Sequence, residues 1–165
     1  MNKPWIIALC LLGFAAAAVA QENAHRLGVG ANYWIALDDL SSDVDENGFS
    51  YLLTYQWRPG LVGLQLDGEM LPDRFGEDAY APAAYVIVGK AIYAAAGIGI
   101  VNQDGDWADD PFFALKAGLD LEVLPRIYLD ISASYRFDAE TDLGDAVDAI
   151  DTDTVFLGAA ARFGF

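Results

Sequence analysis

The residues best suited to chemistry in this 165-residue chain are carboxylates gathered in short segments. Asp43 and Asp45 are followed by Asn47 and Gly48, so oxygen ligands occupy positions 1, 3 and 5 of an EF-hand-like calcium loop and glycine occupies position 6. Position 12 is Thr54 instead of the usual bidentate glutamate, so only the first half of the loop matches. The segment either binds calcium or magnesium weakly or is a solvated acidic loop with a turn at Asn47-Gly48.

A second acidic cluster lies further along the chain, around Gly105. Hard carboxylate oxygens at this density suit the same weak binding of calcium or magnesium. The candidate metal ligands of the two clusters are Asp43, Asp45, Asn47, Asp104 and Asp106. No other cofactor is expected.

Nucleophilic catalysis has no visible basis in the sequence. His25 is the single histidine, and it precedes the first expected strand, away from the long loops. Cys10 is the single cysteine, and it lies in an N-terminal segment that we expect to be removed. Because no cysteine and no Ser–His pair would then be left to act, we do not expect an enzyme.

Charged residues also recur at alternate positions within otherwise apolar stretches. Side chains two residues apart share one face of a strand, so these charges are predicted to point to one side. Unpaired charges in a closed interior are costly, and the five acids and four bases nearly cancel, which predicts a hydrogen-bonded ion-pair network. The expected members are Arg26, Asp67, Glu69, Lys116, Asp120, Glu122, Asp130, Arg136 and Arg162.

The elements that position these charges are strands with one apolar and one more polar face. In the last of them, Leu157 and Phe163 lie on the apolar face, whereas Arg162 lies on the other. Segment 80–88 is apolar on both faces, so its orientation is not assigned. Each strand has roughly the 9–11 residues that a tilted transmembrane strand needs. The eight predicted strands span residues 26–37, 49–58, 62–70, 80–88, 92–100, 113–123, 127–137 and 155–165.

The connections alternate between tight turns and long loops. Turns are expected at 58–60, 89–90 and 124–126, and loops at about 38–48, 71–79, 102–111 and 138–153. The loops hold 19 of the 25 acidic residues and one base, Arg74, in a chain of net charge −16. Short turns on one side and long loops on the other are typical of outer-membrane barrels. A soluble lipocalin-like barrel is the alternative, but it would bury its apolar face.

The N-terminus is typical of an exported chain. Lys3 precedes an apolar run of about 14 residues, which is short for a membrane-spanning helix of roughly 20. Ala18-Val19-Ala20 then places small residues at the −3 and −1 positions of a signal-peptidase site. We predict a cleaved signal peptide over residues 1–20 and a barrel domain over residues 21–165.

The mature chain resembles the small outer-membrane β-barrel superfamily, which includes the barrel of outer-membrane protein A. Its ending, 159–165, is similar to the C-terminal signal read by the barrel-assembly machinery. The block 111–137 resembles the family's hairpin, which ends in a Tyr-Arg-aromatic motif, and 93–99 is similar to its Gly-x-Gly strand. The resemblance implies an all-β fold, an eight-stranded antiparallel transmembrane β-barrel in the bacterial outer membrane. The expected assembly signal comprises Tyr135, Phe163 and Phe165.

Two functions fit such a barrel. An eight-stranded barrel is just wide enough for side chains to fill, which predicts a plugged structural barrel that displays acidic loops. The alternative is a narrow, cation-preferring, porin-like channel whose acidic loops concentrate cations. Expected partners are outer-membrane lipid and, through the loops, proteins or cation-bridged lipopolysaccharide. Nucleic acid is not expected, because it needs a basic surface.

Deleting Phe165 is expected to impair assembly, because the aromatic terminus would no longer be presented to the assembly machinery. The measurement is the amount of folded, heat-modifiable protein in the outer-membrane fraction. Normal insertion of the deletion variant would contradict the proposed role of this residue.

Overall fold

The structure, a computed structural model, describes residues 24–36, 47–72, 78–103, 105–108, 110–138 and 154–165. The expected signal peptide and much of the expected acidic loops lie outside the described residues. No helix within the described ranges is long and apolar enough to cross a membrane.

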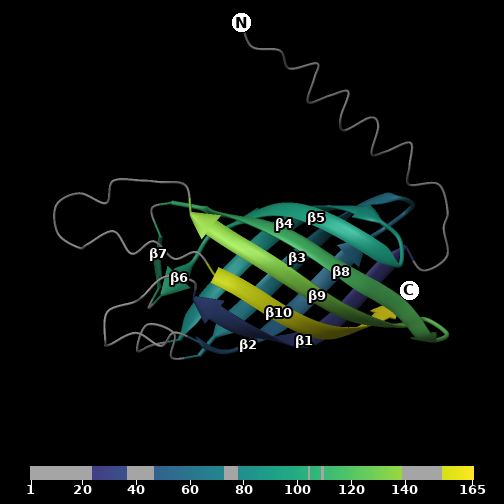
Figure 1. Ribbon diagram of the computed structural model, residues 1–165, viewed down its shortest axis with the longest axis horizontal. Helices are drawn as coiled ribbons and strands as arrows, with labels where there is room; N and C mark the ends of the chain where they lie inside the picture. The colour runs from purple at the N-terminus through teal and green to yellow at the C-terminus, as the bar shows by residue number, and fades with distance from the viewer. Residues whose placement is uncertain (1–23, 37–46, 73–77, 104, 109, 139–153) are drawn as a thin grey trace, which may run out of the picture.

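Within the described residues, eight long strands build the molecule, and they agree with the eight predicted ones (Figure 1). Two short strands, β6 (Asn102–Gln103) and β7 (Asp106–Trp107), form a small hairpin where the sequence predicted a loop. The long strands are β1 (His25–Ala36), β2 (Asn47–Trp57), β3 (Val62–Leu71), β4 (Ala79–Gly89), β5 (Ile92–Gly99), β8 (Phe112–Leu124), β9 (Ile127–Asp138) and β10 (Thr154–Gly164).

The eight long strands close into a barrel. Each one pairs antiparallel with its two neighbours, in the order β3-β2-β1-β10-β9-β8-β5-β4, and β4 pairs with β3 to complete the ring. The seam between the first and last strands runs from Arg26 opposite Gly164 to Ala36 opposite Thr154. This confirms the predicted fold class, a closed eight-stranded antiparallel barrel.

Side chains alternate between a buried inner face and an exposed outer face along the strands. In β3, for example, Leu64 and Leu66 are exposed, whereas Gln65 and Asp67 are buried. β4 follows the same rule and buries Tyr85, so the structure assigns the faces that the sequence left open. The outer face is apolar and the inner face carries the charge, an inversion of the usual arrangement that suits a lipid surrounding.

The ends of the barrel differ. The tight turns and the C-terminus lie at one end, which we call the turn end, and β6 and β7 lie at the other, the loop end (Figure 1). The turn between β8 and β9 consists of Pro125 and Arg126, and Arg126 adopts a left-handed backbone with φ of 66°. Hydrogen bonds hold this strained residue: Arg126 N donates to Glu122 over 2.9 Å, and Gly164 N donates to Arg126 O over 2.8 Å.

Inward-facing glycines make room for large side chains on neighbouring strands. A Cβ on Gly118 would lie 2.7 Å from the Tyr93 hydroxyl and 2.8 Å from the Ile131 carbonyl, both closer than packed atoms tolerate. A Cβ on Gly48 would lie 2.9 Å from the Trp34 indole. By contrast, Gly68 faces outward, and nothing lies within 4 Å of a Cβ placed there.

We expect Gly118→Ala to lower the free energy of unfolding by about 1–3 kcal/mol, because the added methyl overpacks the interior against Tyr93. Urea unfolding of the refolded barrel in lipid vesicles measures the effect. Gly68→Ala is the matched control, and it should be neutral or stabilise by up to about 1 kcal/mol, since glycine in a strand costs backbone entropy. Equal effects of the two variants would show that interior space is not the cause.

Candidate functional site: the charged interior of the barrel

Charged side chains fill the interior of the barrel in three layers between the turn end and the loop end. Each layer is built by inward-facing positions of strands that lie far apart in the sequence but meet across the narrow lumen. The strand alternation that exposes leucines outside therefore fixes these side chains inside.

Asp120 of β8 is the centre of the first layer, at the turn end. Among the described residues, its carboxylate contacts Arg26, Arg58 over 2.5 Å and Arg162 over 3.6 Å. Arg162 also lies 3.0 Å from Asp130, so one connected cluster links five side chains. Three guanidinium groups on two carboxylates leave this layer with an excess positive charge.

Arg58 closes the turn end of the lumen. It follows the last residue of β2, and its guanidinium donates hydrogen bonds to the carbonyl oxygens of Gly89 and Lys90, over 2.8 and 2.6 Å. Burial lowers the pKa of Arg58, and the negative charge of Asp120 opposes that shift. Arg58 thereby links the β2–β3 turn to the β4–β5 turn at the turn end of the barrel.

The second layer is centred on Asp67 of β3. Lys116 Nζ lies 2.8 Å from its carboxylate, and Gln65 Nε2 donates to it over 2.7 Å. Gln56 in turn donates to Gln65 over 2.7 Å. The ammonium group of Lys116 also lies 4.6 Å from the ring centre of Tyr85, within the range of a cation–π contact.

The third layer is centred on Glu69, two residues along β3. Its carboxylate is ion-paired with Arg136 and accepts hydrogen bonds from Ser50 and from Asn32, the latter over 2.6 Å. A carboxylate buried this deeply needs such partners, because an unpaired charge in an apolar interior is strongly unfavourable. All three layers therefore pair carboxylates with cations, and the second and third layers add neutral donors.

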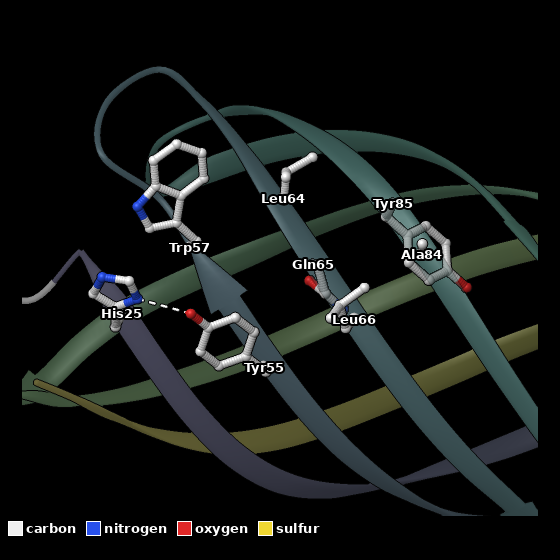
Figure 2. A pocket seen from close by; sticks show the side chains of 8 residues that line it. All are labelled: His25, Tyr55, Trp57, Leu64, Gln65, Leu66, Ala84 and Tyr85. Atoms are coloured by element: carbon white, nitrogen blue, oxygen red, sulfur yellow. Dashed lines mark hydrogen bonds between the residues drawn. The ribbon is translucent and has the colours of Figure 1, made fainter. Parts of the chain in front are cut away.

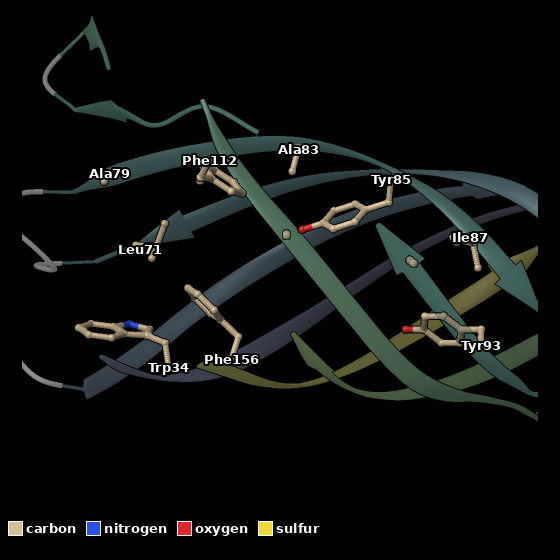
Figure 3. Close-up of a cluster of buried hydrophobic side chains, with 12 residues drawn as sticks. Trp34, Leu71, Ala79, Ala83, Tyr85, Ile87, Tyr93, Phe112 and Phe156 are labelled. Carbon is tan, nitrogen blue, oxygen red and sulfur yellow. The ribbon is translucent and has the colours of Figure 1, made fainter. Parts of the chain in front are cut away.

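An apolar layer covers the charges at the loop end (Figure 3). Trp34, Phe112 and Phe156 are buried together there with Leu71. The guanidinium of Arg136 lies 3.9 Å from the ring centre of Phe156, so the apolar layer packs directly on the third charged layer. Among the described residues, Trp34, Phe112 and Phe156 therefore lie at the loop end of the lumen, and most of the arginines lie at the turn end.

The structure differs from the sequence-based prediction at two positions of this set. Glu122 is exposed and does not join the interior charges, although the alternation of side chains along β8 places it on the inward face. The pairing of β5 with β8 ends at Leu119, so Glu122 projects beyond the enclosed lumen, next to a register shift at Leu124. Arg58 belongs to the charged interior instead, and its signal was its position on the inward parity of β2, two residues after Gln56.

The candidate metal ligands are only partly described. Asp43, Asp45 and Asp104 lie outside the described residues. Asn47 accepts a hydrogen bond from the Tyr33 hydroxyl over 3.1 Å, and Asp106 is exposed in β7. The described part of the chain contains no group of three or more metal-ligating side chains.

The expected assembly residues lie on the outer surface. Phe163 and Phe165 are both about half exposed at the turn end, and the Phe165 ring stacks on His25 with centroids 5.8 Å apart. Phe165 N also donates to the carbonyl oxygen of His25 over 2.9 Å. Tyr135 lies towards the loop end and stacks on Phe137 with centroids 5.7 Å apart.

A closed antiparallel barrel with an apolar outer face and a charged lumen defines an integral β-barrel of the bacterial outer membrane. The sequence matches the family described as outer membrane protein beta-barrel domain over residues 6–163, and the chain belongs to that family. The predicted membrane location and superfamily are thereby confirmed. No curated protein sequence matches the chain.

Solved structures of bacterial outer-membrane barrels share the fold. Neisserial surface protein A (NspA) superposes with a TM-score of 0.66 at 16% identity, covering 88% of this chain and 100% of its own. The N-terminal β-barrel domain of Pseudomonas aeruginosa OprF gives a TM-score of 0.55 at 14% identity, covering 87% of this chain and 98% of its own. At these identities the likeness concerns the fold alone.

We expect Asp120→Asn to destabilise the barrel by about 3–5 kcal/mol, because it removes the carboxylate that neutralises Arg26 and Arg58 in a buried setting. Glu122→Gln, two residues away on the same strand and exposed, is the matched control and should change stability by no more than about 0.5 kcal/mol. Urea unfolding in vesicles measures both. Similar values for the two variants would mean that the interior charges do not stabilise the barrel.

Proposed function

We propose that this protein is a plugged structural barrel that anchors in the outer membrane and presents acidic loops at the cell surface. The observation that carries the proposal is the filling of the lumen: three layers of paired charges lie beneath an apolar layer around Trp34 and Phe156. Ions cross an apolar constriction poorly, since each would lose its hydration there without a replacement.

The second part of the proposal concerns the loops. They hold 19 of the 25 acidic residues, and long loops lie on the extracellular side in proteins of this class. A surface of this charge favours basic proteins, or lipopolysaccharide bridged by divalent cations, as contacts. We also propose that residues 1–20 direct export and are removed, and that assembly uses the aromatic C-terminus.

One observation favours a narrow channel as the second candidate. Buried polar atoms in the middle of the barrel, including Gln56 Oε1 and Arg136 Nε, have no hydrogen-bond partner among the described residues. Buried polar atoms are commonly satisfied by water, and a chain of waters beside the ion pairs would provide a path for small cations. The acidic loops would then raise the cation concentration at its entrance.

Single-channel conductance of the refolded, heat-modifiable protein in a planar bilayer distinguishes these functions. A plugged barrel is expected to remain silent, because its charges are locked in pairs beneath the apolar layer. Discrete cation-selective steps that disappear in Glu69→Gln or Asp120→Asn would overturn the plug and make transport the function. Glu122→Gln is the control, since that side chain lies outside the lumen.

A further inference from the structure

A groove crosses the outer surface of the barrel near the turn end (Figure 2). It encloses about 420 Å³, within the range of roughly 300–1,000 Å³ that is usual for small-molecule sites. The outward-facing side chains along it come from four adjacent strands, β1 to β4. They are His25, Tyr55, Trp57, Leu64, Leu66 and Ala84.

The groove is polar at one end and apolar at the other. His25 and Trp57 are directly opposite each other at the turn end, and a ring nitrogen of His25 lies 2.8 Å from the Tyr55 hydroxyl. Further along, Leu66 lies opposite Ala84, towards the middle of the barrel. Figure 2 shows His25, Tyr55 and Trp57 gathered near the β2–β3 turn, with Ala84 at the far end.

Ala84 creates the floor of the apolar end. Its partners on the neighbouring strands are Leu66 and Ile98, both large and exposed, and Val86 follows on the same face. A methyl group among these longer side chains leaves a depression on the outer surface. The depression has the apolar lining that a hydrocarbon chain requires.

The position of the groove on the outer face of the barrel indicates which class of ligand can bind there. The outer face of this barrel is in contact with membrane lipid, so the molecule presented to the groove is a lipid and not a water-soluble ligand. The turn end of such barrels faces the periplasm, and tyrosine and tryptophan favour the headgroup level of a bilayer. An exposed histidine at this level offers its second ring nitrogen to a phosphate oxygen.

We propose that the groove is a binding site for one phospholipid of the periplasmic leaflet. One acyl chain lies along Leu64, Leu66 and Ala84, and the phosphate lies at the His25 end. Bulk lipid is as apolar as the groove, so occupancy depends on close packing and on the headgroup contact, not on the hydrophobic effect.

Native mass spectrometry of the protein refolded in detergent tests this site. The probes are dioleoylphosphatidylethanolamine and, with the same chains but no phosphate, diolein. The wild-type protein is expected to retain one phospholipid molecule and much less diolein. Ala84→Trp fills the apolar end of the groove. It should reduce the retained phospholipid by roughly tenfold, because the acyl chain can no longer pack against the floor of the groove.

Ala96→Trp is the matched control, because Ala96 is also an outward-facing alanine but does not line the groove, and it should leave retention unchanged. His25→Phe keeps an aromatic ring beside Phe165 and removes the ring nitrogens, so it should lower phospholipid retention to the level of diolein. If Ala84→Trp does not fold, Ala84→Leu fills the same depression with a smaller change.

Equal loss of lipid in the Ala84 and Ala96 variants would overturn the site, since it would reveal only non-specific lipid around the barrel. Equal retention of diolein and phospholipid by the wild-type protein would overturn the role of the phosphate and of His25. Loss in the Ala84 variant alone, together with a preference for the phospholipid, is the result that the proposal requires.

Discussion

Backbone hydrogen bonding in lipid is the constraint on which the rest of the structure depends. A strand in hydrocarbon finds no water, so each N–H and C=O must pair with a neighbouring strand, and no sheet edge can remain open. The pairing of β1 with β10 meets this requirement by joining the two ends of the sheet. Once the ring is closed with eight strands, its diameter is set, and every inward side chain must fit within a narrow lumen.

The composition of the interior follows from that fixed width. Large inward side chains such as Trp34 and Tyr93 are accommodated because glycine lies beside them on the next strand, at Gly48 and Gly118. Charged side chains remain inside because partners reach them across the lumen, as Lys116 of β8 reaches Asp67 of β3. The same narrowness that excludes a wide pore makes these cross-barrel pairs possible.

Much of this arrangement was predictable from the sequence because strand alternation is a local property. The alternation along the sequence alone predicts that Leu64 lies on one face of the strand and that Gln65 and Asp67 lie on the other. The charges of opposite sign on the inward parity likewise indicated an interior network before any contact was known. The faces of β4 were not predictable, because Tyr85 and Val86 are both apolar, and only their neighbours decide which one is buried.

Features that depend on where neighbouring strands end were not predictable. Glu122 has the inward parity but lies outside the lumen, since β8 continues past the last residue that β5 pairs with it. Arg58 continues the inward alternation of β2 after Gln56, but it lies just past the end of the strand, and its contact with Asp120 depends on how the turn folds. The short β6–β7 hairpin arises in a segment whose acidic composition indicated only a loop.

The meeting of His25 and Phe165 at the turn end has a topological consequence. A 2.9 Å backbone hydrogen bond joins them, so the two ends of the described barrel adjoin. Every strand in the closed ring therefore has a paired neighbour on both sides, including β1 and β10. The order of strands around the ring is therefore independent of where the chain is cut. A circular permutant that joins these ends and opens in a long loop would keep every strand pair while moving the aromatic terminus into the interior of the chain. Such a permutant would separate two requirements: the stability of the closed ring and the proposed recognition of its last strand during assembly.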